Sequence, residues 1–161
     1  MSIKVDLSKV VPVGSMSGED IEETRLLFQM HTEAENYLKA FKWCGDVIES
    51  YLGIGVGGVI GIFLFHIRPI ADDADEWIWI IVGDLPPAYI SIEVAPNPAT
   101  ALDAYIGAME EWVECVKQGK IIDGLIPVNV PASLANAKQL ESRLTFLDRE
   151  ILSKYADDLK T

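Results

Sequence analysis

Cysteine and basic residues are scarce in this chain. Cys44 and Cys115 are the only cysteines, and neither belongs to a Cys-x-x-Cys or Cys/His cluster, so the chain alone cannot supply a structural zinc site. Lys and Arg number 13 against 25 Asp and Glu, which gives a net charge of −12. That balance opposes nucleic-acid binding, which depends on cations that neutralise phosphates. It suits a soluble protein, or one whose acidic surface meets a basic partner.

The motifs that name a reaction are also missing. The sequence has no Gly-x-Ser-x-Gly, His-Glu-x-x-His, Walker loop or kinase motif, so it predicts no catalytic residue, no metal ligand and no cofactor. Residues 53–58 match Gly-x-Gly-x-x-Gly, but a dinucleotide site needs a strand before that motif and a helix after it. Here the pattern before the motif is helical and a strand follows, which favours a glycine loop that is either flexible or tightly packed against another backbone segment.

Long apolar runs are absent as well. The first residues have no apolar core of a secretory signal, and the uncharged run 51–65 is broken by glycines. That run falls short of the ~20 residues that a spanning helix needs. Together with two isolated thiols, this predicts a cytoplasmic protein in a reducing compartment, with no membrane partner.

Residues 77–94 are the stretch around which the chain is organised. Residues 77–82 are apolar and rich in aromatic and β-branched types, as in a buried strand. Gly83-Asp84 and Pro86-Pro87 then force a turn, and alternation resumes over 88–94. An earlier run, 60–68, has the same character and ends at Pro69. The acidic residues 71–76 between these runs predict a solvated hairpin turn.

The remaining segments show helical spacing. A long amphipathic helix is predicted to begin at about Ser17 and to continue past Phe41, with Gly45 as the residue that could end it. A second helical piece is predicted around 47–52. Asn97-Pro98 begins another helix, which ends at Lys117-Gln118-Gly119. Residues 120–131 form a connector, and a last helix covers 132–157. Its apolar stripe comprises Leu140, Leu144, Leu147 and Ile151.

These elements predict an α+β fold. A small antiparallel sheet of about three strands (60–68, 77–83 and 88–94) should pack against long N- and C-terminal helices. Residues 1–16 are an extended lead-in, and 17–161 form a single domain.

Asp84, Tyr89 and Trp79 are the candidate ligand-binding residues, because they lie in or beside the Gly83–Tyr89 turn. Two structural interpretations compete with a binding role: Asp84 could accept backbone N–H bonds across the turn, and Trp79 could belong to the core. His66 is predicted about 20 Å from Asp84, at the opposite ends of paired strands, so a His-Asp dyad is not expected. His31, on the apolar face of its helix, is predicted to be partly buried.

The sequence from Trp79 to Ser91, which contains Gly-Asp-Leu-Pro-x-x-Tyr-Ile-Ser, resembles a family of small bacterial proteins classed only as a domain of unknown function. Trp43-Cys44 and Leu140-Glu141-Ser142-Arg143 are similar to weaker landmarks of that family. The resemblance implies a bacterial protein and an intact domain, but no activity. Ala88 stands where the family is expected to carry a second acid.

Three functional hypotheses follow. The first is a non-catalytic protein-binding module, of toxin-neutralising or regulatory type, whose acidic surface meets a basic protein. The second is an enzyme or small-ligand-binding protein with a pocket beside the Gly83–Tyr89 turn. The third is a homodimer formed through the C-terminal helix. The first is the preferred interpretation.

Overall fold

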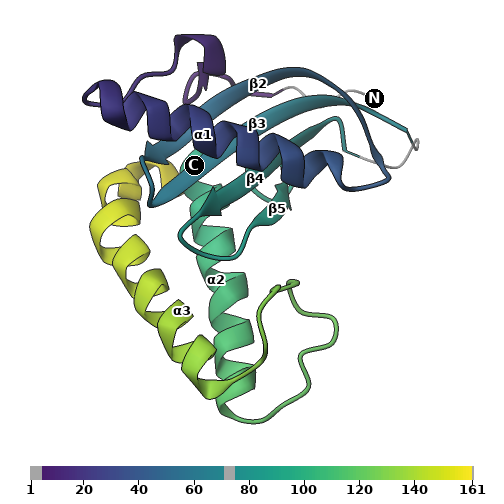
Figure 1. Cartoon of the computed structure of the whole chain (residues 1–161), viewed down its shortest axis with the longest axis vertical. Helices are drawn as coiled ribbons and strands as arrows, with labels where there is room; N and C mark the ends of the chain where they lie inside the picture. Colours follow the sequence, from purple (N-terminus) through teal and green to yellow (C-terminus); the bar gives the residue numbers. More distant parts are fainter. Residues whose placement is uncertain (1–4, 71–74, 161) are drawn as a thin grey trace.

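The computed structural model describes residues 5–70 and 75–160. It has an α+β architecture in which helices cover both faces of one sheet (Figure 1). The elements, in chain order, are strand β1 (Val11–Pro12), 3-10 helix η1 (Val13–Ser15), helix α1 (Ile21–Lys39), strands β2 (Cys44–Val56), β3 (Ile60–Pro69), β4 (Trp77–Gly83) and β5 (Ala88–Ser91), helices α2 (Pro98–Lys117) and α3 (Leu134–Phe146), π-helical turn η2 (Leu147–Ile151) and 3-10 segment η3 (Leu152–Lys160).

Within the described residues, the sheet has five antiparallel strands in the order β1-β2-β3-β4-β5. The three predicted strands are present, at 60–69, 77–83 and 88–91. The last is shorter than the predicted 88–94, because the amides of Val94 and Ala95 donate to the Ser91 carbonyl and turn the chain away. The lead-in predicted for residues 1–16 supplies the short strand β1, which pairs with Leu52 and Tyr51 of β2.

The helical piece predicted around residues 47–52 is wrong: this segment is the middle of β2, which pairs with β3 along most of its length. The glycines of β2 allow it to be covered closely on both faces. A Cβ on Gly53 would lie 2.8 Å from Pro98 of α2, and one on Gly55 would lie 2.8 Å from the side chain of Leu27 of α1. Gly53 and Gly55 therefore belong to a strand and not to the predicted glycine loop, and side chains of two helices pack closely on them.

Each face of the sheet carries its own core. On one face, α1 contributes Leu27, Met30, Ala34 and Leu38, which pack against alternate residues of β3 and β4. On the other face, α2, α3, η2 and η3 cover the remaining strand residues and form the larger core. Figure 1 shows α1 lying across the strands, while α2 and α3 run side by side away from the sheet.

Local sequence signals explain where the helices begin. The Asp20 carboxylate accepts the Glu23 amide at 2.8 Å, so α1 begins after Asp20 and not at the predicted Ser17. The predicted Asn97-Pro98 start is confirmed, because Asn97 and Thr100 form a reciprocal capping box with Pro98 at the first helical position. Ser133 caps α3 by accepting the Asn136 amide at 3.1 Å.

The predicted last helix is present from 134 onward, but its regular α-helical part ends at Phe146. The stripe predicted on it is buried in the larger core: Leu140, Leu144, Leu147 and Ile151. None of the helices in the described ranges is long and apolar enough to span a bilayer. The acidic turn predicted at 71–76 lies mostly outside the described residues, which resume at Asp75.

Candidate functional site

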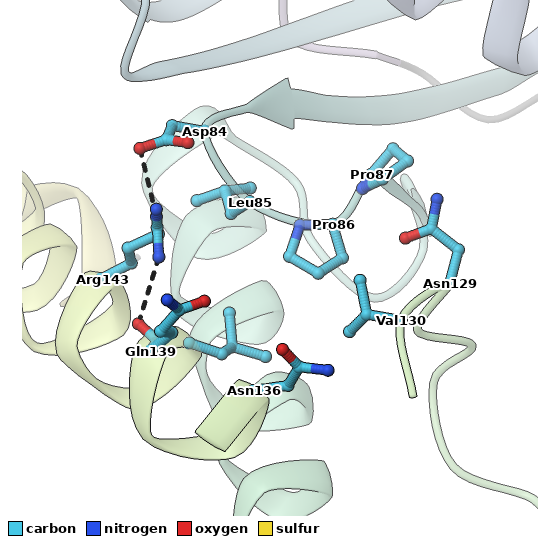
Figure 2. A pocket seen from close by; sticks show the side chains of 10 residues that line it. Asp84, Leu85, Pro86, Pro87, Asn129, Val130, Asn136, Gln139 and Arg143 are labelled. Carbon is cyan, nitrogen blue, oxygen red and sulfur yellow. Dashed lines mark hydrogen bonds and ion pairs between the residues drawn. The ribbon is translucent and has the colours of Figure 1, made fainter. Parts of the chain in front are cut away.

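A cavity opens beside the turn between β4 and β5, and we call it the turn pocket (Figure 2). Its volume is about 300 Å³. The turn forms one side, the connector before α3 forms another, and α3 provides the polar wall. The lining residues are Asp84, Leu85, Pro86, Pro87, Asn129, Val130, Asn136, Gln139, Leu140 and Arg143.

An ion pair joins the turn to α3 across this pocket. The Arg143 Nε atom donates to Oδ2 of Asp84 at 3.1 Å, and both side chains are partly exposed, by 41% and 71% respectively. An exposed pair of this kind contributes only about 0–1 kcal/mol to folding. The Asp84 carboxylate was predicted to accept backbone N–H groups of the turn, but its hydrogen bond comes from the Arg143 side chain. It is the Asp84 amide that bonds to backbone, at the Val59 carbonyl, 3.1 Å away.

The turn is also held from beneath, by Tyr105 of α2. Its hydroxyl donates to the Pro86 carbonyl at 2.6 Å from a fully buried position. Burial raises the pKa of the Tyr105 phenol well above its ordinary value of 10, so the group stays protonated and remains a donor. The hydroxyl of a buried tyrosine usually has a hydrogen-bond partner. A tyrosine on the apolar face of a predicted helix is therefore the feature of the sequence that could have indicated this contact.

A second hollow lies on the other side of the ion pair, and we call it the Phe146 hollow. Its volume is about 260 Å³, and it shares Asp84, Leu85 and Arg143 with the turn pocket. The rest of its lining is mostly apolar: Val59, Ser142, Phe146 and Leu147. The Asp84–Arg143 pair therefore separates two hollows of different polarity.

The structure does not bring Asp84, Tyr89 and Trp79 together. Trp79 is 1% exposed in the larger core, and its indole nitrogen donates to the Ala95 carbonyl at 2.7 Å. The position of Trp79 therefore supports the interpretation that this residue belongs to the core. Tyr89 points to the opposite face of the sheet, where its ring packs against Phe41 and Trp43 at centroid distances of 5.1 and 5.4 Å. Only Asp84 lines the turn pocket.

The histidines lie away from this pocket. His66 pairs with Trp77 at one end of the β3–β4 ladder, whereas Gly83, next to Asp84, pairs with Ile60 at the other end, so the expected separation is confirmed. The His66 ring stacks on Trp77 at 4.1 Å. His31 is half-buried, as predicted, with its Nε2 atom 2.9 Å from the Ser50 hydroxyl. Burial lowers the pKa of His31, and the nearby Glu35 carboxylate partly opposes that effect.

A groove with an acidic lining runs between α2 and α3, with a volume of about 250 Å³; we call it the acidic groove. Its charged residues are Glu110 and Glu114 of α2, Glu141 of α3, and Asp148 and Arg149 of η2. Lys117 neutralises Glu141, since its Nζ atom lies 2.8 Å from Oε2. Three carboxylates and one guanidinium remain. In the described part of the chain, no group of three or more His, Cys, Asp or Glu is arranged to hold a metal ion.

Sequence reasoning missed most of these lining residues. The packing of α3 beside α2 is what brings three of them to the turn: Asn136, Gln139 and Arg143. In the sequence, Arg143 is 59 positions from Asp84. The one pointer in the sequence was the landmark 140–143 of the family resemblance. No protein-family model matches the chain, and neither a curated protein nor a solved structure does so. The resemblance stays a prediction.

Proposed function

We propose that this protein is a non-catalytic binding module that associates with a basic protein partner, in a regulatory or toxin-neutralising role. The acidic groove between α2 and α3 is the observation that carries the proposal. It offers a concave surface and a net excess of negative charge in the same place. Both are features of surfaces that attract a complementary partner.

The arrangement of charge in the groove favours recognition of Lys or Arg side chains. Glu110 and Glu114 are one helical turn apart on α2, so their carboxylates repel each other in the free protein. Asp148 adds a third carboxylate from the opposite wall. A cation placed between them relieves that repulsion. Because the groove is concave, salt should screen ion pairs formed inside it less than it screens ion pairs on a flat, exposed surface.

A binding experiment with a defined probe tests this proposal. Labelled oligolysine is titrated at low salt against the parent protein and against a variant carrying Glu110→Gln, Glu114→Gln and Asp148→Asn. We expect the variant to bind at least about tenfold more weakly, which corresponds to losing several partly exposed ion pairs. Oligoglutamate serves as the negative probe.

The matched control changes the net charge equally at exposed carboxylates elsewhere: Glu33→Gln, Asp46→Asn and Glu93→Gln. It should retain most of the affinity. Equal losses in the two triple variants would mean that general acidity, and not the groove, attracts the probe. No salt-dependent binding by the parent protein would remove the proposal altogether.

The turn pocket favours a second candidate function, the binding of a small ligand. Its volume lies at the lower end of ligand sites, about 300 Å³. A homodimer through the C-terminal helix stays a prediction. Because the apolar stripe of that helix is buried in the chain's own core, a second copy would have to meet a different face of the helix.

A further inference from the structure

The ion pair beside the turn pocket leaves much of its hydrogen-bonding capacity unused. Arg143 contacts Asp84 through Nε alone, and its Nη1 atom reaches the Gln139 carbonyl only at 3.5 Å. A guanidinium carries five N–H donors and a carboxylate accepts at both oxygens. In the part of the chain that the structure describes, no other side chain completes the bonding of either group. Figure 2 shows the guanidinium at the edge of the cavity, between Asp84 and Gln139.

The two hollows flanking this pair differ in chemistry. The turn pocket presents the side-chain amide of Gln139 near the pair, and Asn136 lines the pocket farther along α3. The Phe146 hollow presents apolar surface from Val59, Phe146 and Leu147. A ligand that parts the pair would therefore meet a positive group, a negative group and an apolar surface next to one another.

We propose that this site binds a free α-amino acid with an apolar side chain. The ligand's carboxylate binds the unused N–H groups of Arg143, because a guanidinium fork matches a carboxylate in geometry. The ligand's ammonium binds Asp84, and its side chain enters the Phe146 hollow. Both charges of the zwitterion are compensated, so the ligand replaces one internal ion pair by two intermolecular ones.

Opening the Asp84–Arg143 pair is compatible with stable folding. Both side chains are partly exposed, and pairs of this kind stabilise a fold little. The turn itself is held by other contacts, from Tyr105 to Pro86 and from the Asp84 amide to Val59. The site shares no lining residue with the acidic groove, so this inference does not depend on the proposed basic partner.

Titration calorimetry with four probes tests the inference. L-leucine and L-phenylalanine should bind saturably, with a dissociation constant of about 1 mM or below. N-acetyl-L-leucine lacks the ammonium and L-leucinamide lacks the carboxylate, so each should bind at least about tenfold more weakly, which matches the loss of one charge-assisted contact. Absence of saturable binding by both amino acids would overturn the proposal, and so would equal binding of leucine and its acetylated form.

Variants locate the binding. Arg143→Gln and Asp84→Asn should each weaken leucine binding at least about tenfold, with folding verified by circular dichroism. Arg25→Gln and Glu22→Gln are the matched controls, since they break a similarly exposed ion pair on α1. These controls should bind leucine like the parent protein. If the Asp84 and Arg143 variants also bind like the parent, the amino acid binds elsewhere and the assignment fails.

Discussion

The two faces of the sheet differ in how their buried polar atoms are used. On the α1 face, His31 contacts the hydroxyl of Ser50, so one side chain of the helix meets one side chain of the sheet. On the α2 face, two buried aromatic residues donate to backbone carbonyls of loops: Trp79 to Ala95 and Tyr105 to Pro86. The hydrogen bonds on the α2 face therefore hold the segments that shape the turn pocket, whereas those on the α1 face do not reach these segments. Substitutions in the core on the α2 face should therefore alter the conformation of the turn pocket.

The largest effect is expected from Trp79→Ala. Removing this fully buried ring should lower the free energy of unfolding by about 3–5 kcal/mol, measured by urea denaturation followed by circular dichroism. It should also shift the amide NMR resonances of residues 84–87. The Ala95 carbonyl loses its donor, and β4, which leads into the turn, loses the packing of the Trp79 ring.

Leu27→Ala is the comparison on the α1 face. It should cost about 2–4 kcal/mol and leave the resonances of residues 84–87 in place. If the two substitutions perturb those resonances equally, the proposed difference between the faces does not exist.

Gly83→Ala should lower the free energy of unfolding by about 2–4 kcal/mol. Gly83 has φ +151°, and a Cβ there would lie 2.2 Å from the Val59 carbonyl oxygen, so the turn would have to move. Thermal and urea unfolding measure the loss. Gly107→Ala is the matched control: this exposed position in α2 has open space for a Cβ, and stability should rise by about 0.5–1 kcal/mol.

Tyr105→Phe is expected to cost about 1–2 kcal/mol, because the Pro86 carbonyl loses its donor while the packing of the ring is kept. Hydrogen exchange should show faster opening of the turn and unchanged protection in α1. Faster exchange in α1 to the same degree would argue against a connection specific to the α2 face.

The smallest effect concerns pH and the α1 face. Because burial lowers the pKa of His31 from about 6.5, the unfolded chain binds a proton more readily than the folded protein does. The free energy of unfolding should therefore fall as the pH drops below about 6.5. In His31→Gln that contribution is absent, so stability should depend less on pH between about 7 and 5. Urea unfolding at several pH values measures this, and identical pH profiles would contradict the assigned cause.

Much of the fold could be predicted from local signals. The Pro86-Pro87 corner and the apolar runs around it give the β4–β5 hairpin, and Asn97-Pro98 marks the start of α2. The segment 44–56 was misassigned because Val47, Ile48, Tyr51 and Leu52 have helical spacing, and glycines obscure the alternation of a strand. Its pairing with β3 and its coverage by two helices decide its conformation. These are tertiary effects, which the β-strand propensities of the individual residues do not include.

The site was less predictable than the fold. Asp84 could be singled out because it follows Gly83 in a rigid turn. Its partner Arg143 lies on a helix whose position depends on packing against α2, after a connector with no periodicity. Tyr89 was assigned to the same surface as Asp84, but alternation along β5 turns its side chain to the α1 face.

The order of the strands has a kinetic consequence. From β3 to β5 every strand pairs with the one that precedes it in the chain, so this part of the sheet can form by successive addition across short connections. Little loop-closure entropy is lost before each new ladder begins to contribute. Contacts of greater sequence separation, such as that between Asp84 and Arg143, close last. The hairpins should thus acquire protection from solvent early in refolding, and the hollows beside the turn should take shape only when α3 docks.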